Sequence, residues 1–412
     1  MPGKPPGGQA QALSELKVVE LGAFAAGPAV GKHLANHGAE VIHVESRTRP
    51  DGFRANYPPY KDNQAGPERA AMFAMTHDSK LGVTLNLKNR SGLDLGRRLL
   101  QRADVLIENF TPGTLARLGL GYDQLAVLNP GLVLLSTCNQ GQTGPHSQQP
   151  GFGSHLTSLA GLTHLTGWPD REPALVWGPY IDYIAVAFGA VAVLAAVEQR
   201  RQSGHGCHID LSQYETGLQF MVPALLDYAA TGRVAQRSGN RDPGAAPHGI
   251  FPTRDAERWC AISVHDDDEW LRLRQALGDP HWAQDADLLF AAGRQAAAAE
   301  LEAHLADFTR RLSTAELINT LRRAGVHGAP VNNMADLFSD PQLASRQTWR
   351  SVEHPVIGHY SAEGPPFLLS ETPARIDSAA PLLGEHNRHV FCDLLGLSDG
   401  EYARLEAEGA FE

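Results

Sequence analysis

The feature that most constrains the fold is a regular alternation of strand-like and helix-like segments between residues 16 and 138. Apolar, strand-like composition recurs at 16–21, 40–46, 82–87, 104–110 and 131–138, with helical patterns at 27–40, 91–103 and 114–120. Strands that alternate with helices pair in parallel, and the helices then cover both faces of the sheet. The pattern therefore predicts an α/β fold built on a parallel sheet.

The remainder of the chain is predicted to leave this sheet and come back. Residues 1–15 have the composition of a flexible lead-in, 16–225 form the first part of the large domain, and 226–254 are a linker rich in Gly and Pro that begins within a mostly helical segment, 208–232. Residues 255–330 are expected to form a smaller α+β domain, with a strand at 258–264 and a solvated helix at 293–313. Residues 331–412 are expected to be a return linker followed by a strand-then-helix segment.

The composition of the chain limits which partners and which cellular compartment are expected. The chain has 412 residues, with 35 lysines and arginines against 46 aspartates and glutamates, for a formal net charge of −11 at pH 7. This charge repels nucleic acids and anionic membranes, so neither is an expected partner. Four scattered cysteines without disulfide-like or zinc-like spacing, and an N-terminus without the apolar stretch of a signal peptide, predict a cytoplasmic protein.

Several familiar sites are missing from the sequence. No strand is followed by GxGxxG, and the segment GPAVGK (27–32) is one residue short of a P-loop and is followed by His33 where Ser or Thr would hold magnesium. No GxSxG elbow occurs, and the close pair His386 and His389 lacks further ligands. We therefore expect neither nucleotide hydrolysis nor a metal site, and no prosthetic group.

Asp182 is the most informative single residue. It lies just before an uncharged, mostly apolar run from Ile184 to Val197, which is shorter than the ~17–20 residues of a membrane span and so predicts a buried helix. An aspartate at a helix start is usually an N-cap that accepts backbone N–H bonds. The helix N-terminus would also lower its pKa, while apolar surroundings strip water and favour a nucleophile. The residues alone fit both roles.

A series of motifs places the chain beside a known family. They are AGP (26–28), HGAEVIHVES (37–46), VTLNLKNRSG (83–92), ADVLIENFTPGTLARLGLGYDQL (103–125), GQTGP (141–145), LTGWPDREP (165–173), YIDYIAVAFGAVAVLAAVEQRRQSGHGCHIDLSQYE (180–215), GNRDPGAAPHGIFPT (239–253) and LLGEHN (382–387). In this order they resemble the class III CoA-transferases, the family of formyl-CoA transferase and carnitine CoA-transferase.

The resemblance implies a fold and a reaction. The fold would be a Rossmann-like large domain formed by both chain ends, including 331–412, with a smaller domain inserted late, in an interlocked homodimer. The aspartate at the position of Asp182 is the nucleophile of this family, and it passes through an acyl-aspartyl anhydride and an aspartyl-CoA thioester. Acyl-CoA and a small carboxylic acid would be the substrates, with succinyl-CoA a possible donor.

The resemblance also transfers a set of CoA-binding residues. By position against formyl-CoA transferase, they come from the first strand end, the TLNLK segment and the ENF block, and the basic members would pair with CoA phosphates. Arg47 is a further candidate. Ser46 occupies the position at which the family has an arginine, and Arg47 is the next residue. The full set is Phe24, Ala26, Arg47, Leu85, Lys88, Asn109, Phe110 and Arg117.

Departures from the family pattern bear on the substrate. Ala25 stands where formyl-CoA transferase has an active-site glutamine, and Asn139 and Gln140 precede GQTGP, so formate and oxalate are not expected. The contexts of Asp182 and of GWPDREP look more like the branch with dicarboxylate CoA-transferases. Two alternatives stay open: a relative of the α-methylacyl-CoA racemases, for which His155 lies near the required histidine position at Phe152, and a CoA-binding protein without catalysis.

Overall fold

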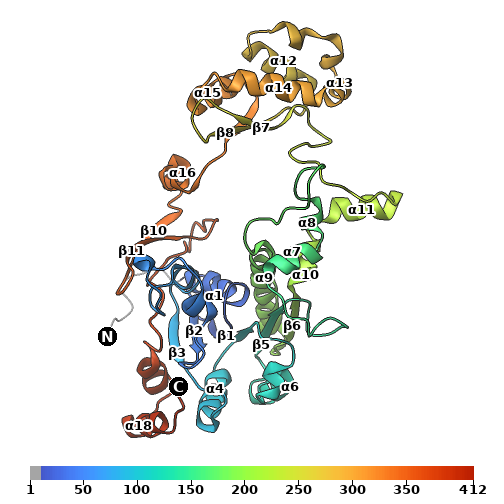
Figure 1. Ribbon diagram of the computed structural model, residues 1–412. Coiled ribbons are helices and arrows are strands. Elements are labelled where there is room, and N and C mark those ends of the chain that lie inside the picture. The colour runs from blue at the N-terminus through green and yellow to red at the C-terminus, as the bar shows by residue number, and fades with distance from the viewer. Residues whose placement is uncertain (1–10) are drawn as a thin grey trace. The chain divides into compact units, whose positions relative to one another are not determined.

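The computed structural model describes residues 11–412, which form two units (Figure 1). The larger unit contains residues up to Leu162, Leu175–Ala230 and Pro341–Glu412, and the smaller unit contains Thr163–Ala174 and Thr231–Asp340. Segments from both ends of the described chain thus build the larger unit.

The centre of the larger unit is a six-stranded sheet in the order β3-β2-β1-β4-β5-β6, and every neighbouring pair is parallel. This confirms the predicted parallel sheet, and its strand order is that of a Rossmann fold. The strands are β1 (Lys17–Leu21), β2 (Glu40–Glu45), β3 (Leu81–Thr84), β4 (Val105–Glu108), β5 (Val133–Cys138) and β6 (His208–Ser212).

Helices cover both faces of this sheet, as the nearly continuous apolar strands require. On one face, α4, α5 and α6 and the C-terminal residues 390–411 bury Val19, Leu106 and Leu134. On the other face, α1 and α9 bury Val18 and Val105. The helices of the larger unit are α1 (Ala26–Asn36), α2 (Gly52–Asn56), α3 (Ala71–Thr76), α4 (Arg90–Gln101), α5 (Thr114–Arg117), α6 (Tyr122–Leu128), α7 (Gly153–Leu159), α9 (Tyr180–Ser203), α10 (Gln213–Leu218), α11 (Val222–Thr231), α17 (Pro341–Ser345) and α18 (Asp399–Ala407).

The apolar run after Asp182 lies in α9, whose 24 residues make it long and apolar enough, by length and composition alone, to cross a membrane. In the structure α9 packs on α1, α7, α10, β5 and β6. Its contact with α1 is close, because a Cβ at Gly189 would lie 2.9 Å from Val30 Cγ2. The helix therefore serves as a core element of the sheet layer.

Both remaining sheets are antiparallel. In the larger unit, β10 (Trp349–His354) pairs with β11 (Gly358–Glu363), and a π-helical turn follows at His389–Leu394. The smaller unit has a three-stranded sheet in the order β7-β8-β9, packed against helices around the fully buried Trp270. Its elements are β7 (His248–Pro252), β8 (Trp259–Ser263), β9 (His327–Pro330), α12 (Asp267–Ala276), α13 (Ala291–Ala296), α14 (Ala298–Thr309), α15 (Thr314–Ala324) and α16 (Met334–Ser339). The sequence boundary between the two units falls within α8 (Leu162–Leu165).

The structure corrects several predicted boundaries. Segment 208–232 begins with strand β6 before it becomes helical, because Ile209 and Leu211 face the sheet layer between polar neighbours. Residues 231–254 are part of the smaller unit rather than a linker, since β7 pairs with β8. Residues 331–340 also belong there, where Asp336 pairs with Arg258. The predicted helix at 293–313 is divided into α13 and α14.

The expected N-terminal lead-in is described only in part. Residues 1–10 lie outside the described residues. Within 11–15 the chain is anchored rather than free, because the Leu13 amide donates to the His37 carbonyl at 3.0 Å. Leu16, which follows, is buried.

We predict that Gly189→Val destabilises the larger unit by about 1–3 kcal/mol, because the added methyl groups must overlap Val30 where α9 meets α1. Ala195→Val, at an exposed position of the same helix, is the matched control and should change stability by less than about 1 kcal/mol. Urea unfolding of both variants measures the difference. Equal stability of the two variants would contradict the close packing.

Candidate active site

Asp182 lies in a cavity of about 220 Å³, here called the aspartate pocket. Its walls come from segments that follow the carboxyl ends of β1, β4 and β5, the edge at which open parallel sheets bind ligands. The lining residues are Phe24, Ala25, Ala26, Asn109, Phe110, Thr111, Pro112, Cys138, Asn139, Ser147, Gln149, Pro150, Gly151, Phe152, Asp182 and Gln213. Asp182 is the one acidic residue among these described lining residues.

The environment of Asp182 differs from the expected N-cap. Helix α9 begins at Tyr180, so Asp182 is in the first turn, and Pro179 precedes the helix without a side-chain cap. Burial raises the pKa of Asp182 to about 7, whereas the sequence predicted a lowered pKa. Desolvation is the cause of this shift, and the carboxylate is a stronger base than a solvated aspartate.

A glycine fixes the position of this carboxylate. A Cβ at Gly153, the first residue of α7, would lie 2.8 Å from Asp182 Oδ2 and 2.5 Å from Pro179 Cβ. No larger residue fits at this position without moving the start of α9. The close approach leaves one side of the carboxylate covered by backbone and the other facing the cavity.

A larger cavity of about 620 Å³, here called the long pocket, adjoins the aspartate pocket. Phe24, Asn109, Phe110 and Thr111 line both cavities. The other residues of the long pocket come from the last residues of β1 and β2, from the segments after β1, β2 and β3 including α2, and from the two ends of α5: Leu21, Gly22, Ala23, Val44, Glu45, Ser46, Thr48, Arg49, Pro50, Asp51, Gly52, Asn56, Leu85, Asn86, Leu87, Lys88, Thr114 and Leu118.

The structure brings most of the predicted binding residues together. Leu85 and Lys88 line the long pocket, Ala26 lines the aspartate pocket, and Phe24, Asn109 and Phe110 line both.

Two predicted basic residues lie outside these linings. The Arg117 guanidinium donates to Thr114 Oγ1 at 2.8 Å, and Thr114 is itself part of the long pocket. Arg47 reaches the chain at Gly384, with its Nη2 3.1 Å from where a Cβ would lie. Arg49, two residues further, lines the long pocket in its place.

Sequence reasoning missed further residues of the aspartate pocket, among them Phe152 and Gln213. Gln213 is buried and is the first residue of α10, directly after β6. Had HIDLS been interpreted as a strand, the residue after it would have been a candidate by the same rule that favours strand carboxyl ends. Phe152 has no such signal in the sequence.

The racemase alternative needs a second proton-transfer group opposite Asp182. The described lining of the aspartate pocket contains no histidine. Phe152, at the position where the sequence analysis sought one, lines the pocket, and the His155 ring turns back to the Phe152 amide at 3.2 Å. This geometry gives no support to a two-base isomerisation.

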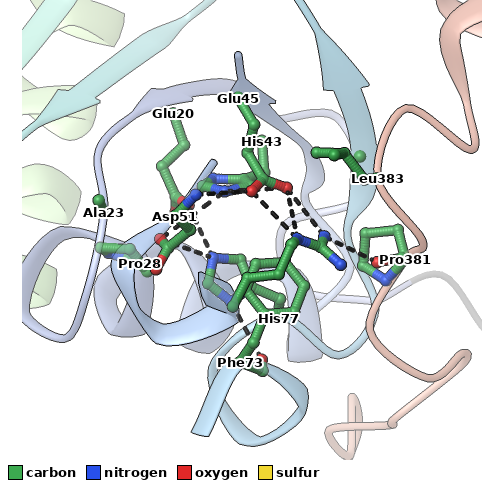
Figure 2. A network of polar contacts seen from close by, with 12 residues as sticks. Glu20, Ala23, Pro28, His43, Glu45, Asp51, Phe73, His77, Pro381 and Leu383 are labelled. Atoms are coloured by element: carbon green, nitrogen blue, oxygen red, sulfur yellow. Dashed lines mark hydrogen bonds and ion pairs between the residues drawn. The ribbon is translucent and has the colours of Figure 1, made fainter. Parts of the chain in front are cut away.

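A group of metal-ligating side chains lies elsewhere in the unit. Glu20, His43 and His77 are buried with donor atoms within 4.8 Å of one another (Figure 2). However, the Lys80 ammonium already binds both Glu20 oxygens at 3.0 and 3.1 Å, and Glu20 Oε1 lies 2.6 Å from His43 Nδ1. Zinc ligands about 2.0–2.2 Å from a tetrahedral ion lie further apart than that. The distances favour an ion-pair network, and we assign no metal to it.

The site so described defines a class of protein. A single desolvated carboxylate faces a cavity at the carboxyl edge of a parallel sheet, and that cavity shares four residues with a longer pocket that carries Lys88 and Arg49. Such a site suits an enzyme that transfers a group through its own aspartate while an extended anionic substrate lies alongside.

The comparisons agree with this class. The family model described as CoA-transferase family III matches residues 13–387. Succinyl-CoA–D-citramalate CoA-transferase of Chloroflexus aurantiacus is 36% identical over 397 residues, which cover 96% of this chain and 97% of that protein. Succinate–glutarate CoA-transferase of Agrobacterium fabrum is 31% identical over 383 residues, covering 93% and 95%. A crystal structure of a CAIB/BAIF family protein from Brucella suis has a TM-score of 0.86 and 31% identity, covering 94% of this chain and 100% of that one. The chain belongs to CoA-transferase family III, and it is a CoA-transferase.

We predict that Asp182→Asn makes the protein more stable at pH 8 by about 1–3 kcal/mol, because the wild-type protein holds a charged carboxylate in a desolvated site. The folded pKa of about 7 lies above the unfolded value of 3.8, so the wild-type penalty is full above pH 7 and is lost as the pH falls toward 4. Thermal unfolding of both proteins between pH 4 and 8 measures this. A stability difference that does not change with pH would rule out desolvation as its cause.

Proposed function

We propose that the enzyme transfers CoA from succinyl-CoA to a small carboxylic acid through covalent intermediates on Asp182. The observation that carries this proposal is that Asp182 provides the one carboxylate in the described lining of a cavity that shares its walls with the long pocket. The long pocket would hold CoA, with Lys88 and Arg49 as cations for its phosphates. The acyl end would enter the aspartate pocket.

The proposed reaction consumes and releases one anion at each step. An Asp182 oxygen attacks the thioester carbonyl carbon, the C–S bond breaks, and CoA thiolate leaves an acyl-aspartyl anhydride. The thiolate attacks the aspartyl carbonyl, which expels the donor acid as a carboxylate and leaves an aspartyl-CoA thioester. The acceptor carboxylate attacks this thioester and displaces the thiolate. The thiolate then attacks the acceptor's acyl carbon, which forms the new acyl-CoA and frees Asp182.

The walls of the aspartate pocket suit this sequence of steps. A carboxylate with a pKa of about 7 is more basic, and so more nucleophilic, than a solvated one. Phe24, Pro150 and Phe152 give the cavity an apolar lining, which with substrate bound would limit access of the water that hydrolyses the anhydride and the thioester. Each intermediate retains an activated acyl group, so the exchange requires no nucleotide.

The names of the relatives support the substrates of this proposal. The Chloroflexus aurantiacus protein is named for succinyl-CoA and D-citramalate, and the Agrobacterium fabrum protein for succinate and glutarate. Both names contain a four-carbon dicarboxylate. We propose succinyl-CoA as the donor and a short dicarboxylic or hydroxydicarboxylic acid as the acceptor.

The proposed assembly is an interlocked homodimer. Helix α11 supports it, because its sequence VPALLDYAAT is largely apolar and yet none of its residues is buried. Leu226 and Tyr228 are 63% and 58% exposed, and Phe220 before the helix is 54% exposed. Apolar patches of this kind are typical of a surface that a partner covers. A second copy of the chain is the partner expected in this family.

We also propose a cytoplasmic location. The four cysteines, Cys138, Cys207, Cys260 and Cys392, are all free thiols. Free thiols that persist in a protein of this size fit a reducing compartment.

The covalent step predicts a trapped adduct. During turnover of succinyl-CoA with glutarate, hydroxylamine should convert Asp182 to its hydroxamate, and borohydride should reduce it, because only an activated aspartyl carbonyl reacts with either reagent. Mass spectrometry of the peptide containing Asp182 detects the change, and Asp182→Asn, with transfer activity abolished, is the control. Normal transfer with an unmodified Asp182 would refute the assignment. Uptake of α-deuterium from deuterated water without any acceptor acid would instead favour the racemase alternative.

The assembly predicts a change of mass. The double substitution Leu225→Asp with Leu226→Asp should convert a dimer into monomers, because two charges would be buried without partners at the interface. Light scattering after gel filtration measures this. Val127→Asp, at an 83% exposed position of α6, is the control and should leave the dimer intact. A wild-type protein that is monomeric and fully active would contradict the proposal.

A further inference from the structure

The short loop between β1 and α1 lies at the junction of the two cavities. Phe24, at the end of this loop, lines both the aspartate pocket and the long pocket. Its backbone has a φ of +65°, a left-handed conformation that a non-glycine residue adopts only when its surroundings enforce it.

Two polar side chains hold the loop in this conformation. Asn109 Oδ1 accepts from the Ala23 amide at 2.9 Å, and Asn109 Nδ2 donates to the Ala23 carbonyl at 2.7 Å. The Phe24 amide donates to both oxygens of Asp51, at 3.1 and 3.2 Å. The carboxylate of Asp51 is buried and also accepts from the Phe53 amide at 2.7 Å. The left-handed turn is therefore fixed from β4 on one side and from the start of α2 on the other.

A buried ion pair below the loop fixes the position of Asp51. Its amide donates to Glu45 Oε1 at 2.8 Å, and Glu45 pairs with the buried Arg54 at 2.8 Å. Arg54 also donates to the Pro381 carbonyl at 3.0 Å, which ties this network to the C-terminal part of the chain. Figure 2 shows Asp51, Glu45 and Pro381 in one continuous set of polar contacts.

Two buried histidines also face Asp51. His43 Nε2 and His77 Nε2 lie 4.0 and 3.9 Å from Asp51 Oδ2. These contacts leave little room for the carboxylate to rotate away from the Phe24 amide.

Gly52 sets the position of the Phe24 ring. A Cβ at Gly52 would lie 2.1 Å from two ring carbons of Phe24, so the ring occupies the space that any other residue would fill. The ring meets Phe53, Tyr57 and Phe152 edge to face, with centroids 5.6, 5.9 and 6.1 Å away. Phe152 belongs to the aspartate pocket, so the ring contacts that wall directly.

From this geometry we infer that Asp51 and Gly52 are positioning residues that act through Phe24. They hold its ring at the junction of the two cavities, where the ring orients the thioester of the substrate toward Asp182. The inference rests on the proposed placement of CoA in the long pocket. Asp51 fixes the backbone of Phe24, and Gly52, which has no Cβ, leaves room for the ring beside the start of α2. Displacement of the ring would misplace the thioester carbonyl relative to the Asp182 oxygens, while the rest of the long pocket remained able to bind CoA.

The test is a set of three double-mutant cycles with Phe24→Ala on the full-length protein. Gly52→Ala should lower kcat by about 10- to 100-fold, a larger factor than its effect on the Kd for CoA, because the added methyl moves the ring while the rest of the long pocket stays in place. In a Phe24→Ala background the same substitution should have little further effect, because no ring remains to be displaced. Asp51→Asn, which keeps one oxygen acceptor for the Phe24 amide, should lower kcat less than Asp51→Ala, and both effects should shrink in the Phe24→Ala background.

A merely structural role predicts another pattern. Gly52→Ala with wild-type kcat, or effects of equal factor with and without the Phe24 ring, would overturn the inference. Should Gly52→Ala or Asp51→Ala fail to fold, the cycle of Asp51→Asn with Phe24→Ala decides by the same criterion. Trapping of Asp182 in the wild-type enzyme separates the two proposals: without an adduct the proposed function fails, whereas an adduct with additive cycles refutes only the positioning role.

Discussion

The structure depends on the need of one parallel sheet to bury both of its faces. Strands such as VLIE and VLLSTC are apolar on each side, so they are stable only between two helical layers. Because all six strands are parallel, their carboxyl ends share one edge. The segments that follow β1, β4 and β5 therefore lie next to one another, and they form walls of the aspartate pocket. The position of the candidate active site therefore follows from the parallel strand order, which also buries the apolar strands between two layers of helices.

Charges buried beneath that edge have a different role from the apolar core. Arg54 is 1% exposed and lies between Glu45 and the partly buried Glu68, and Lys80 is equally buried against Glu20. Such pairs contribute little net stability, because desolvation offsets their attraction, but removal of one partner leaves an uncompensated buried charge. They can therefore impose one geometry on the loops above them. Arg54 extends this order across the chain, because one of its acceptors is the carbonyl of Pro381.

The sequence was sufficient to predict those features of the fold and the site that a local pattern or motif determines. The alternation of apolar segments predicts five of the six strands, and motif similarity places Asp182, Phe24, Asn109 and Phe110 in one site, where the cavities bring them together. The sequence was insufficient for properties that depend on burial or on contacts between distant segments. Burial raises the pKa of Asp182, and the extent of that burial cannot be known without the neighbouring atoms. The pairing of β7 with β8, the need for glycine at Gly153 and the choice of Arg49 over Arg47 all depend on contacts between separate segments.

One face of the sheet can be fully buried only late in the synthesis of the chain. The sixth strand is complete at Ser212, yet one face of the sheet is closed by Val390, Phe391, Tyr402, Leu405 and Phe411. During synthesis the part of that face which α4, α5 and α6 do not cover stays exposed to water while Thr231–Asp340, the larger segment of the smaller unit, emerges from the ribosome. An exposed apolar sheet invites association with other chains. The final residues thus act as the closing step of folding, and a chain that stops before them would retain every residue of the aspartate pocket and still lack one wall of its core.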